Sequence, residues 1–176
     1  NEFIYDGTNT DGSFIYAFAA NNSNISKNDM SASGITNNRI KALSLLNSTF
    51  EANENNFEGL FTGIYPSSSN GKILNNNFEN CYIGSYTSGY LDISEVDMWQ
   101  HLESLYLPNG ENPGDNNSLL SGFLQTFSND LYNYQIANNE FNNTRYGIIS
   151  VLGSDDIIHD NTFINIPTTI GEFSSP

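Results

Sequence analysis

The residues best suited to chemistry lie near the C-terminal end of the chain. Asp155 and Asp156 form the only pair of adjacent aspartates, and His159 and Asp160 follow shortly after. A histidine beside carboxylates could bind a metal ion or transfer protons, because imidazole titrates near neutral pH. The other histidine, His101, is distant in the sequence, so His159 is best interpreted as a surface side chain. No metal site, other cofactor or catalytic residue is predicted.

A second acidic stretch, from Asp6 to Gly12, looks like a calcium-binding loop. Such a loop places oxygen ligands at alternating positions and a glycine at the sixth. Counted from Asp6, the sixth position is Asp11. A turn rich in Asp and Gly is therefore the better interpretation. The lone cysteine, Cys81, has no partner for an internal disulfide and is expected to be a small buried residue.

Charge limits the partners of this chain. Five Lys and Arg stand against 20 Asp and Glu, which gives a formal net charge of −15. A field of this sign opposes nucleic acid, anionic membranes and anionic sugars. We therefore expect no nucleic-acid partner and no membrane insertion. The bases that could take a proton from a sugar are Lys27, Arg39, Lys41, Lys72 and Arg145.

A repeat runs through the chain and must position these residues. Each copy has an aromatic or Met anchor, an Asn two residues before it and usually an aliphatic residue five before it. The anchors are Phe3, Met30, Phe57, Phe78, Phe141 and Phe163, and the asparagines are Asn1, Asn28, Asn55, Asn76, Asn139 and Asn161. Four of the intervals between anchors are 21 to 27 residues, and the fifth is 63, which equals 21 plus an insertion of 42.

A period of this length predicts a solenoid, because so short a unit can bury its apolar face only against its neighbours. Apolar and polar residues alternate within each unit, as around Ile73 and Ile136, which indicates strands. We therefore expect an all-β solenoid of about six coils. Residues 1–90 and 135–176 should form the coils, the latter with a C-terminal exit segment.

The asparagine of each repeat has a structural explanation. Asn tolerates left-handed backbone angles and suits a tight bend. Stacked asparagines can also hydrogen-bond to one another through their side-chain amides. We predict a structural stack at the corner of successive coils. Its members are Asn28, Asn55, Asn76, Asn139 and Asn161.

The insertion, residues 91–134, changes from strand-like to helical periodicity. Apolar residues recur three to four apart around Trp99, and again on a stripe that ends at Tyr134. Pro108 and Gly110 separate the two stretches. Two short helices are predicted, with Trp99 buried between them rather than exposed as a platform for sugars.

The repeat resembles that of the right-handed parallel β-helices of the pectate-lyase-like superfamily. The resemblance rests on the aliphatic residue, the Asn-x-Phe and the Gly-Ile pair, best seen at Ile136, Asn139, Phe141 and Gly147-Ile148. It covers residues 1 to 90 and 135 to 170. It implies the fold but not an activity, since this fold serves polysaccharide lyases, glycoside hydrolases, phage tailspikes, adhesins and structural proteins.

Two tripeptides also resemble pieces of polygalacturonase signatures, which belong to enzymes of the same fold. They are Asn9-Thr10-Asp11 and Arg39-Ile40-Lys41. In that family an Asp pair and a Gly-His-Gly lie between the two pieces, and here neither does. Asp11 alone cannot act as the two carboxylates that an inverting glycosidase requires, so we interpret the match as coincidence.

The favoured function is a non-catalytic stalk or binding module of a larger secreted or cell-surface protein, such as an adhesin. Tyr65 and Tyr86 stand at the same position of successive repeats and could contact a neutral glycan through their ring faces. A simple aromatic stack supporting the sheet is the alternative for this pair. The expected partners are thus a neutral glycan or neighbouring modules, and the location is extracellular or cell-surface. The alternative function is a fragment of a polysaccharide lyase or glycoside hydrolase, including a phage tailspike.

Overall fold

The computed structural model describes residues 1–7, 11–33, 39–88, 133–151, 156–166 and 168–173. The chain divides into two units, Asn1–Leu91 with Tyr132–Pro176 and Asp92–Leu131, and every described residue belongs to the first. The predicted helical insertion therefore falls almost wholly outside the described residues, together with Trp99 and His101, and stays a prediction. Its last residue, Tyr134, begins a strand. Residues 8–10 of the calcium-like loop and Asp155 also lie outside the described ranges.

The described residues form three sheets in which every paired strand is parallel. Sheet A contains β1 (Glu2–Tyr5), β4 (Asp29–Ala32), β7 (Asn56–Glu58), β10 (Asn77–Glu79), β13 (Glu140–Asn142) and β16 (Thr162–Ile164). Sheet B contains β2 (Asp11–Phe18), β5 (Arg39–Leu46), β8 (Thr62–Ser67), β11 (Ile83–Ser88), β14 (Tyr146–Val151) and β17 (Thr168–Phe173). Sheet C contains β3 (Ser23–Ser26), β6 (Thr49–Asn53), β9 (Asn70–Leu74), β12 (Tyr134–Ala137) and β15 (Ile157–His159). No helix in these ranges is long and apolar enough to cross a membrane.

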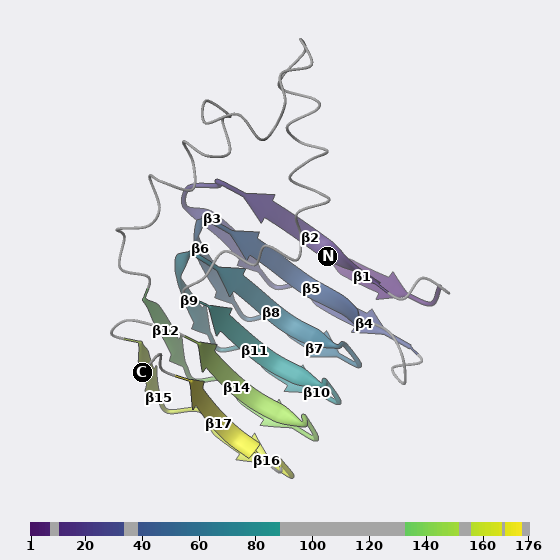
Figure 1. Cartoon of the computed structure of the whole chain (residues 1–176). Coiled ribbons are helices and arrows are strands. Elements are labelled where there is room, and N and C mark those ends of the chain that lie inside the picture. The colour runs from purple at the N-terminus through teal and green to yellow at the C-terminus, as the bar shows by residue number, and fades with distance from the viewer. Residues whose placement is uncertain (8–10, 34–38, 89–132, 152–155, 167, 174–176) are drawn as a thin grey trace, which may run out of the picture. The chain divides into compact units, whose positions relative to one another are not determined.

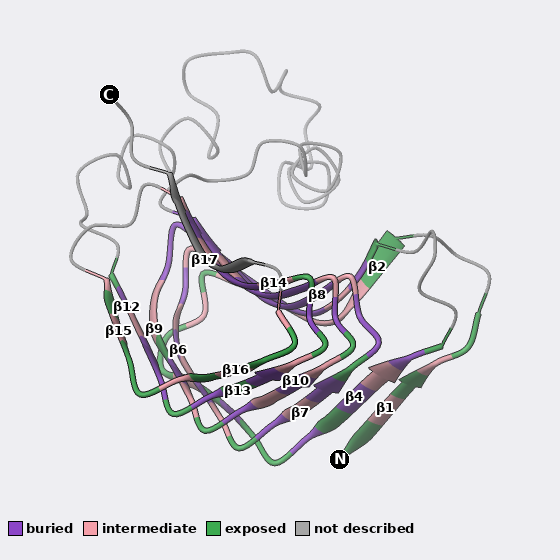
Figure 2. Cartoon of the chain, turned by 90° about the horizontal axis from the view of Figure 1, so that it is seen from below, coloured by how far each residue is buried: buried purple, intermediate pink, exposed green. Residues whose placement is uncertain are grey.

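The chain visits the sheets in a fixed order, A then B then C, and each strand pairs with the strand three places later (Figure 1). We call one passage through sheets C, A and B a coil. Figure 2 shows the three sheets around a common interior. The prediction of an all-β fold built from parallel sheets is confirmed. The arrangement is compatible with a parallel β-helix or solenoid, and its handedness stays a prediction.

The repeat anchors form a column inside sheet A. Phe57 pairs with Phe78, Phe78 with Phe141, and Phe141 with Phe163. Their ring centroids are 4.9, 4.7 and 5.1 Å apart, and the rings are stacked. Successive side chains of a strand point to opposite faces, so the residues on either side of each anchor face outward. This column packs in one core with the aliphatic residues of sheet C and with apolar residues of sheet B, such as Leu43 and Ile64.

Two glycines in sheet B provide space for this column. A Cβ atom on Gly63 would lie 2.5 Å from the ring of Phe78, and one on Gly84 would lie 2.5 Å from the ring of Phe141. Both distances are far inside van der Waals contact. Gly63 and Gly84 each follow an anchor by six residues. Because they have no side chain, each leaves room for the phenyl ring of the anchor in the next coil.

The bend before sheet A is made by a residue other than the expected one. Residues with φ between 55° and 57° directly precede the repeat asparagines: Lys27, Glu54, Asn75, Asn138 and Asp160. The repeat asparagines themselves have no positive φ. The expectation that they supply the left-handed backbone is therefore wrong, and the residue before each of them does so. Their role lies in their side chains.

Candidate functional site

The predicted asparagine stack is confirmed, and Asn1 extends it at one end. Each side-chain amide donates from Nδ2 to Oδ1 of the asparagine in the next coil, over 2.9–3.0 Å. In the interior of the stack, the same Oδ1 also accepts the backbone N–H of the preceding asparagine, as Asn76 does from Asn55 at 2.9 Å. The second amide hydrogen is used as well, since Asn76 Nδ2 donates to the carbonyl of Ala52 at 2.9 Å. The interior asparagines are buried and have no amide group left for a ligand.

The predicted tyrosine pair lies together on sheet B. The ring centroids of Tyr65 and Tyr86 are 5.3 Å apart with the rings tilted by 45°. Lys41 Nζ lies 4.8 Å from the centre of the Tyr65 ring, within the range of a cation–π contact. Tyr65 is only 7% exposed. These contacts favour the supporting role, and glycan contact at this pair stays a prediction.

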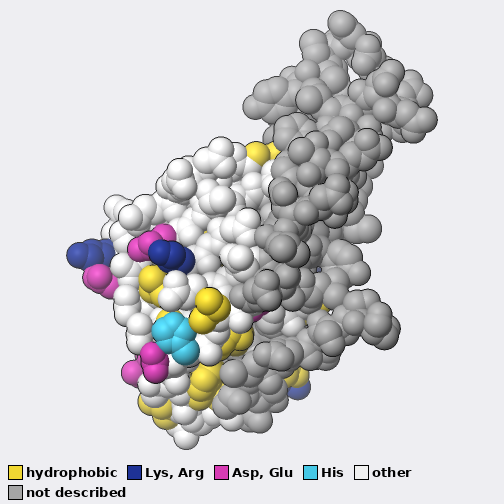
Figure 3. All heavy atoms as spheres, turned by 90° about the vertical axis from the view of Figure 1, so that its left-hand side faces the viewer, with side chains coloured by type: hydrophobic (Ala, Val, Ile, Leu, Met, Phe, Trp, Pro, Cys, Tyr) yellow, Lys and Arg dark blue, Asp and Glu magenta, His cyan; other side chains and the backbone are white. Residues whose placement is uncertain are grey.

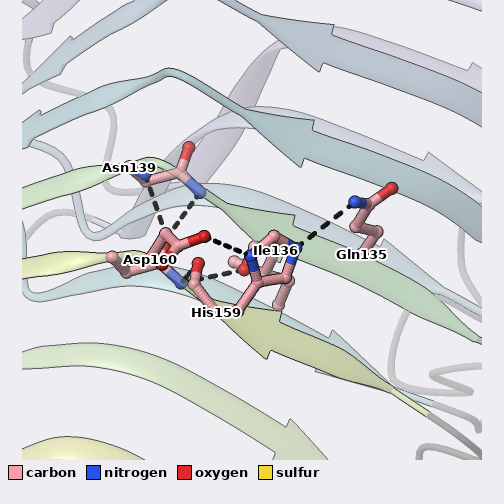
Figure 4. Close-up of polar contacts among 6 residues, drawn as sticks. Gln135, Ile136, Asn139, His159 and Asp160 are labelled. Atoms are coloured by element: carbon pink, nitrogen blue, oxygen red, sulfur yellow. Dashed lines mark hydrogen bonds and ion pairs between the residues drawn. The ribbon is translucent and has the colours of Figure 1, made fainter.

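The residues of the C-terminal acidic stretch separate into two groups. His159 Nδ1 lies 2.7 Å from Asp160 Oδ2, and its Nε2 lies 3.5 Å from Gln135 Nε2 (Figure 4). Asp156 lies elsewhere: its Oδ1 accepts the backbone N–H of Tyr134 at 3.0 Å and its Oδ2 the hydroxyl of Ser150 at 2.6 Å. Within the described ranges, no group of three or more His, Cys, Asp or Glu side chains could hold a metal ion.

Most of the bases named above are held away from a common site. Lys27 forms an exposed ion pair with Glu54 at 3.6 Å. The Arg145 guanidinium lies 5.0 Å from the Tyr82 ring centre, and Lys41 lies over Tyr65. Arg39 begins β5. Lys72 is left as the base that faces a concave surface.

That concave surface is a groove of about 690 Å³, which we call the sheet C groove. It follows the N-terminal ends of the sheet C strands. Its lining comprises Asn22, Ser23, Asn24, Thr49, Phe50, Glu51, Asn70, Gly71, Lys72, Asn133, Tyr134, Gln135 and Ile157. Figure 3 shows this side of the molecule, where a few charged and hydrophobic side chains lie among other side chains and backbone atoms.

Register explains why these side chains gather. Asn24 pairs with Glu51, Glu51 with Lys72, Lys72 with Gln135, and Gln135 with Ile157. Each stands one residue before the aliphatic position of its repeat, such as Ile73 or Ile136. Since that aliphatic residue points into the core, its neighbour must point outward. The five side chains therefore form an outward column, with one rung about every 4.8 Å.

Serine hydroxyls and a tyrosine fix the corner that borders the groove. Ser48 N–H donates to Ser69 Oγ at 3.0 Å, and Ser69 N–H donates to the Tyr134 hydroxyl at 3.2 Å. The Tyr134 hydroxyl donates in turn to the carbonyl of Ser88 at 3.1 Å. Tyr134 and Phe50 are only 1% and 5% exposed. Both residues nevertheless line the groove, as does the exposed Ile157, so its surface combines apolar groups with polar side chains.

Most of the uncharged polar groups in the groove lining are side-chain amides. Five side-chain amides line it, and each offers both donors and an acceptor. The charged members of the lining are one carboxylate, Glu51, and one ammonium group, Lys72. A pair of carboxylates across a sugar, as in the common glycosidase mechanism, is not present in this lining. If the chain were a polysaccharide lyase, Lys72, beside Glu51, would be the candidate for its base within this lining.

Cys81 does not add a nucleophile. Its side chain is buried, and burial raises the pKa of the thiol to about 12. Its Sγ lies 3.6 Å from the carbonyl oxygen of Phe57 and 3.5 Å from that of Glu79. The thiolate is the reactive form, so this cysteine is an inert residue of the core, as expected.

Sequence reasoning missed the sheet C groove. The available signal was the residue before the aliphatic position, which is polar in four of five strands: Asn24, Glu51, Lys72 and Gln135. Comparison with protein-family models, with curated proteins and with solved structures found no match for this chain.

Proposed function

We propose that this chain is a non-catalytic carbohydrate-binding module of a larger secreted or cell-surface protein, and that the sheet C groove binds a neutral glycan. We further propose that its coils form a right-handed parallel β-helix. Support for this hand comes from connections between parallel strands of one sheet, which are right-handed in nearly all proteins. The observation that carries the binding proposal is the groove itself, a concave surface with five side-chain amides in its lining.

Amides suit sugar hydroxyls. A hydroxyl group both donates and accepts hydrogen bonds, and so does the side chain of Asn or Gln. Asn24 and Gln135 lie on the outward column, three rungs apart, with Glu51 and Lys72 between them. Because the rungs are evenly spaced, an extended glycan along the column would meet a polar side chain at successive steps. The interior asparagine stack offers no such groups, since its hydrogen-bonding capacity is used.

Charge supports a neutral ligand. The whole chain carries −15, which repels anionic polymers at a distance. In the groove lining one carboxylate and one ammonium group offset each other. A neutral glycan thus avoids the long-range repulsion and needs no desolvation of an unpaired charge. A uronate polymer would face the repulsion with only Lys72 to oppose it.

A glycan array followed by titration calorimetry tests the proposal. Replacement of both Asn24→Ala and Gln135→Ala should weaken binding of a neutral glycan by at least about tenfold, since each hydrogen bond contributes about 1 kcal/mol. Asn142→Ala is the control, because Asn142 faces outward on sheet A, away from the groove. Absence of any neutral ligand, or equal binding by the groove and control variants, would overturn the binding site.

The same samples test the absence of catalysis. The glycan recovered after long incubation should have its original chain length, with no new reducing ends and no unsaturated sugars. Shortened chains would support the enzyme alternative, and Lys72→Gln would then show whether this base participates.

A further inference from the structure

The bend between a sheet B strand and the following sheet C strand, which we call the B–C corner, is closed by a serine hydroxyl. Ser48 Oγ donates to the Leu46 carbonyl at 2.7 Å. One coil later, Ser69 Oγ donates to the Ser67 carbonyl at 2.8 Å. Each hydroxyl also accepts a backbone N–H of the preceding coil, from Ala20 to Ser48 Oγ at 3.1 Å and from Ser48 to Ser69 Oγ at 3.0 Å. One hydroxyl thus closes its own corner and joins it to the coil before.

The insertion lengthens one B–C corner without shifting the strands that flank it. Three residues join Ser67 to Gly71, whereas 45 residues join Ser88 to Tyr134. Ser88 nevertheless pairs with Ser67, and Tyr134 pairs with Gly71. The strands on both sides of the insertion therefore keep the register of the short corner, although the chain between them is far longer.

The Tyr134 hydroxyl takes the place of the corner serine at this point. It donates to the Ser88 carbonyl at 3.1 Å, as Ser69 Oγ does to the Ser67 carbonyl. It also accepts the Ser69 N–H at 3.2 Å, as Ser69 Oγ accepts the Ser48 N–H. Both hydrogen bonds of the corner hydroxyl are therefore made by a side chain from the far side of the insertion.

Packing holds the Tyr134 ring in the position that this hydroxyl requires. Tyr134 is only 1% exposed. Its ring centroid lies 6.5 Å from that of Phe50, although β9 separates their two strands. Gly71 stands between them on β9, and a Cβ atom there would lie 2.4 Å from the Phe50 ring. The missing side chain at Gly71 thus leaves the space that the two rings share.

We propose that Tyr134 is a positioning residue of the sheet C groove. Its neighbours Asn133 and Gln135 both line the groove. Asn133 N–H donates to Asn70 Oδ1 at 2.9 Å, and Gln135 pairs with Lys72. The hydroxyl fixes the point at which the chain re-enters the stack, and so holds both amide side chains level with their partners on β9. The role of these amides in binding rests on the proposed function, whereas the closure of the corner does not.

Hydrogen exchange of single backbone amides, followed by NMR, tests the closure of the corner. In the unsubstituted chain the Ser69 and Ser48 amides should both exchange slowly. Tyr134→Phe should speed exchange at Ser69 by at least about tenfold, because its acceptor is lost, and leave Ser48 unchanged, because Ser69 Oγ still accepts its N–H. Tyr82→Phe is the matched control, since it removes a hydroxyl from a half-buried ring stacked on Phe61. Fast exchange at Ser69 in the unsubstituted chain, or no change in Tyr134→Phe, overturns the role of the hydroxyl.

Titration calorimetry with the neutral glycan selected on the array tests the positioning. Tyr134→Phe should weaken binding by at least about fivefold, and Tyr82→Phe should not. Gln135→Ala should weaken binding less in the Tyr134→Phe background than in the unsubstituted chain, because a displaced amide contributes less. Asn24→Ala, three rungs away on β3, should weaken binding equally in both backgrounds. A general loss of stability would not separate these two positions.

The outcomes separate this proposal from the one on which it rests. Equal costs of Gln135→Ala in the two backgrounds would overturn the positioning role, even with the glycan bound. If the unsubstituted chain binds no neutral glycan, the proposed function and the positioning of its ligand both fail. Exchange at the Ser69 amide then still decides whether Tyr134 closes the corner.

Discussion

The two ends of a single strand, β9, use asparagine in opposite ways. Asn70 begins the strand at the sheet C groove, is partly exposed, and its Oδ1 accepts one backbone N–H, from Asn133, at 2.9 Å. Asn76 follows the other end, is 2% exposed, and saturates its amide with four hydrogen bonds to three residues. One end borders the groove, and the other holds the coils together.

The difference teaches where function should be sought in this molecule. A buried amide stabilises the fold only while all its hydrogen-bond partners are present. An unsatisfied buried polar group destabilises the folded state by more than one hydrogen bond stabilises it. The buried asparagine stack therefore serves the stability of the fold. The amide side chains of the outward column, Asn24 and Gln135, are not buried in this way, so we expect their substitution to leave the fold intact.

The largest loss of stability should come from a substitution in the buried asparagine stack. Asn76→Ala leaves the N–H and Nδ2 of Asn55 without their acceptor and removes the donor to Ala52. We expect the free energy of unfolding to fall by about 3–5 kcal/mol, measured by urea denaturation. Asn24→Ala in the groove, where the side chain is exposed, should change it by less than about 0.5 kcal/mol. Equal losses would contradict the division of roles.

A second, smaller effect should come from crowding the interior. Gly63→Ala adds a methyl group that would lie 2.5 Å from the Phe78 ring and 2.7 Å from the carbonyl oxygen of Gly84. The backbone oxygen cannot rotate away, so we expect a loss of about 2–3 kcal/mol, read from the same denaturation curves.

Ser85→Ala is the matched control for that substitution. Ser85 pairs with Ile64 on the interior side of sheet B, and its hydroxyl is buried without a hydrogen-bond partner. Removing this oxygen should be neutral or raise the free energy of unfolding by up to about 1 kcal/mol. Destabilisation as large as that of Gly63→Ala would show that the site responds to any change rather than to crowding.

The buried column could be predicted from sequence, whereas the groove could not. Asn and Phe recur at fixed offsets because each position inside the stack meets the same environment in every coil. Outward positions lack this constraint: Glu51, Lys72 and Ile157 occupy the same column with unlike side chains. The groove exists only once the strands are in register, and register is a property of the folded chain.

Burial of Tyr65 was unpredictable for a related reason. Tyr65 and Tyr86 could be assigned to one column from their offsets, and their rings do lie together. Whether such a column is open depends on what covers it, and alternation within a strand says nothing about this. The left-handed corner residues were missed because Lys27 and Glu54 have no conformational signature, unlike the Asn75 and Asn138 of other coils.

The smallest expected change in stability concerns the left-handed residue between each sheet C strand and the repeat asparagine that follows it. Glu54 has φ 55°, and its counterparts in two other coils are Asn75 and Asn138. Asn adopts this conformation more readily than Glu, so Glu54→Asn should raise the free energy of unfolding by about 0.5–1 kcal/mol. The exposed ion pair with Lys27 contributes little. Thermal unfolding measures the gain, and Glu54→Gln, which removes the same charge without the conformational preference, should show none. A gain shared by both variants would assign it to charge, and the corner backbone would then carry no strain for Asn to relieve.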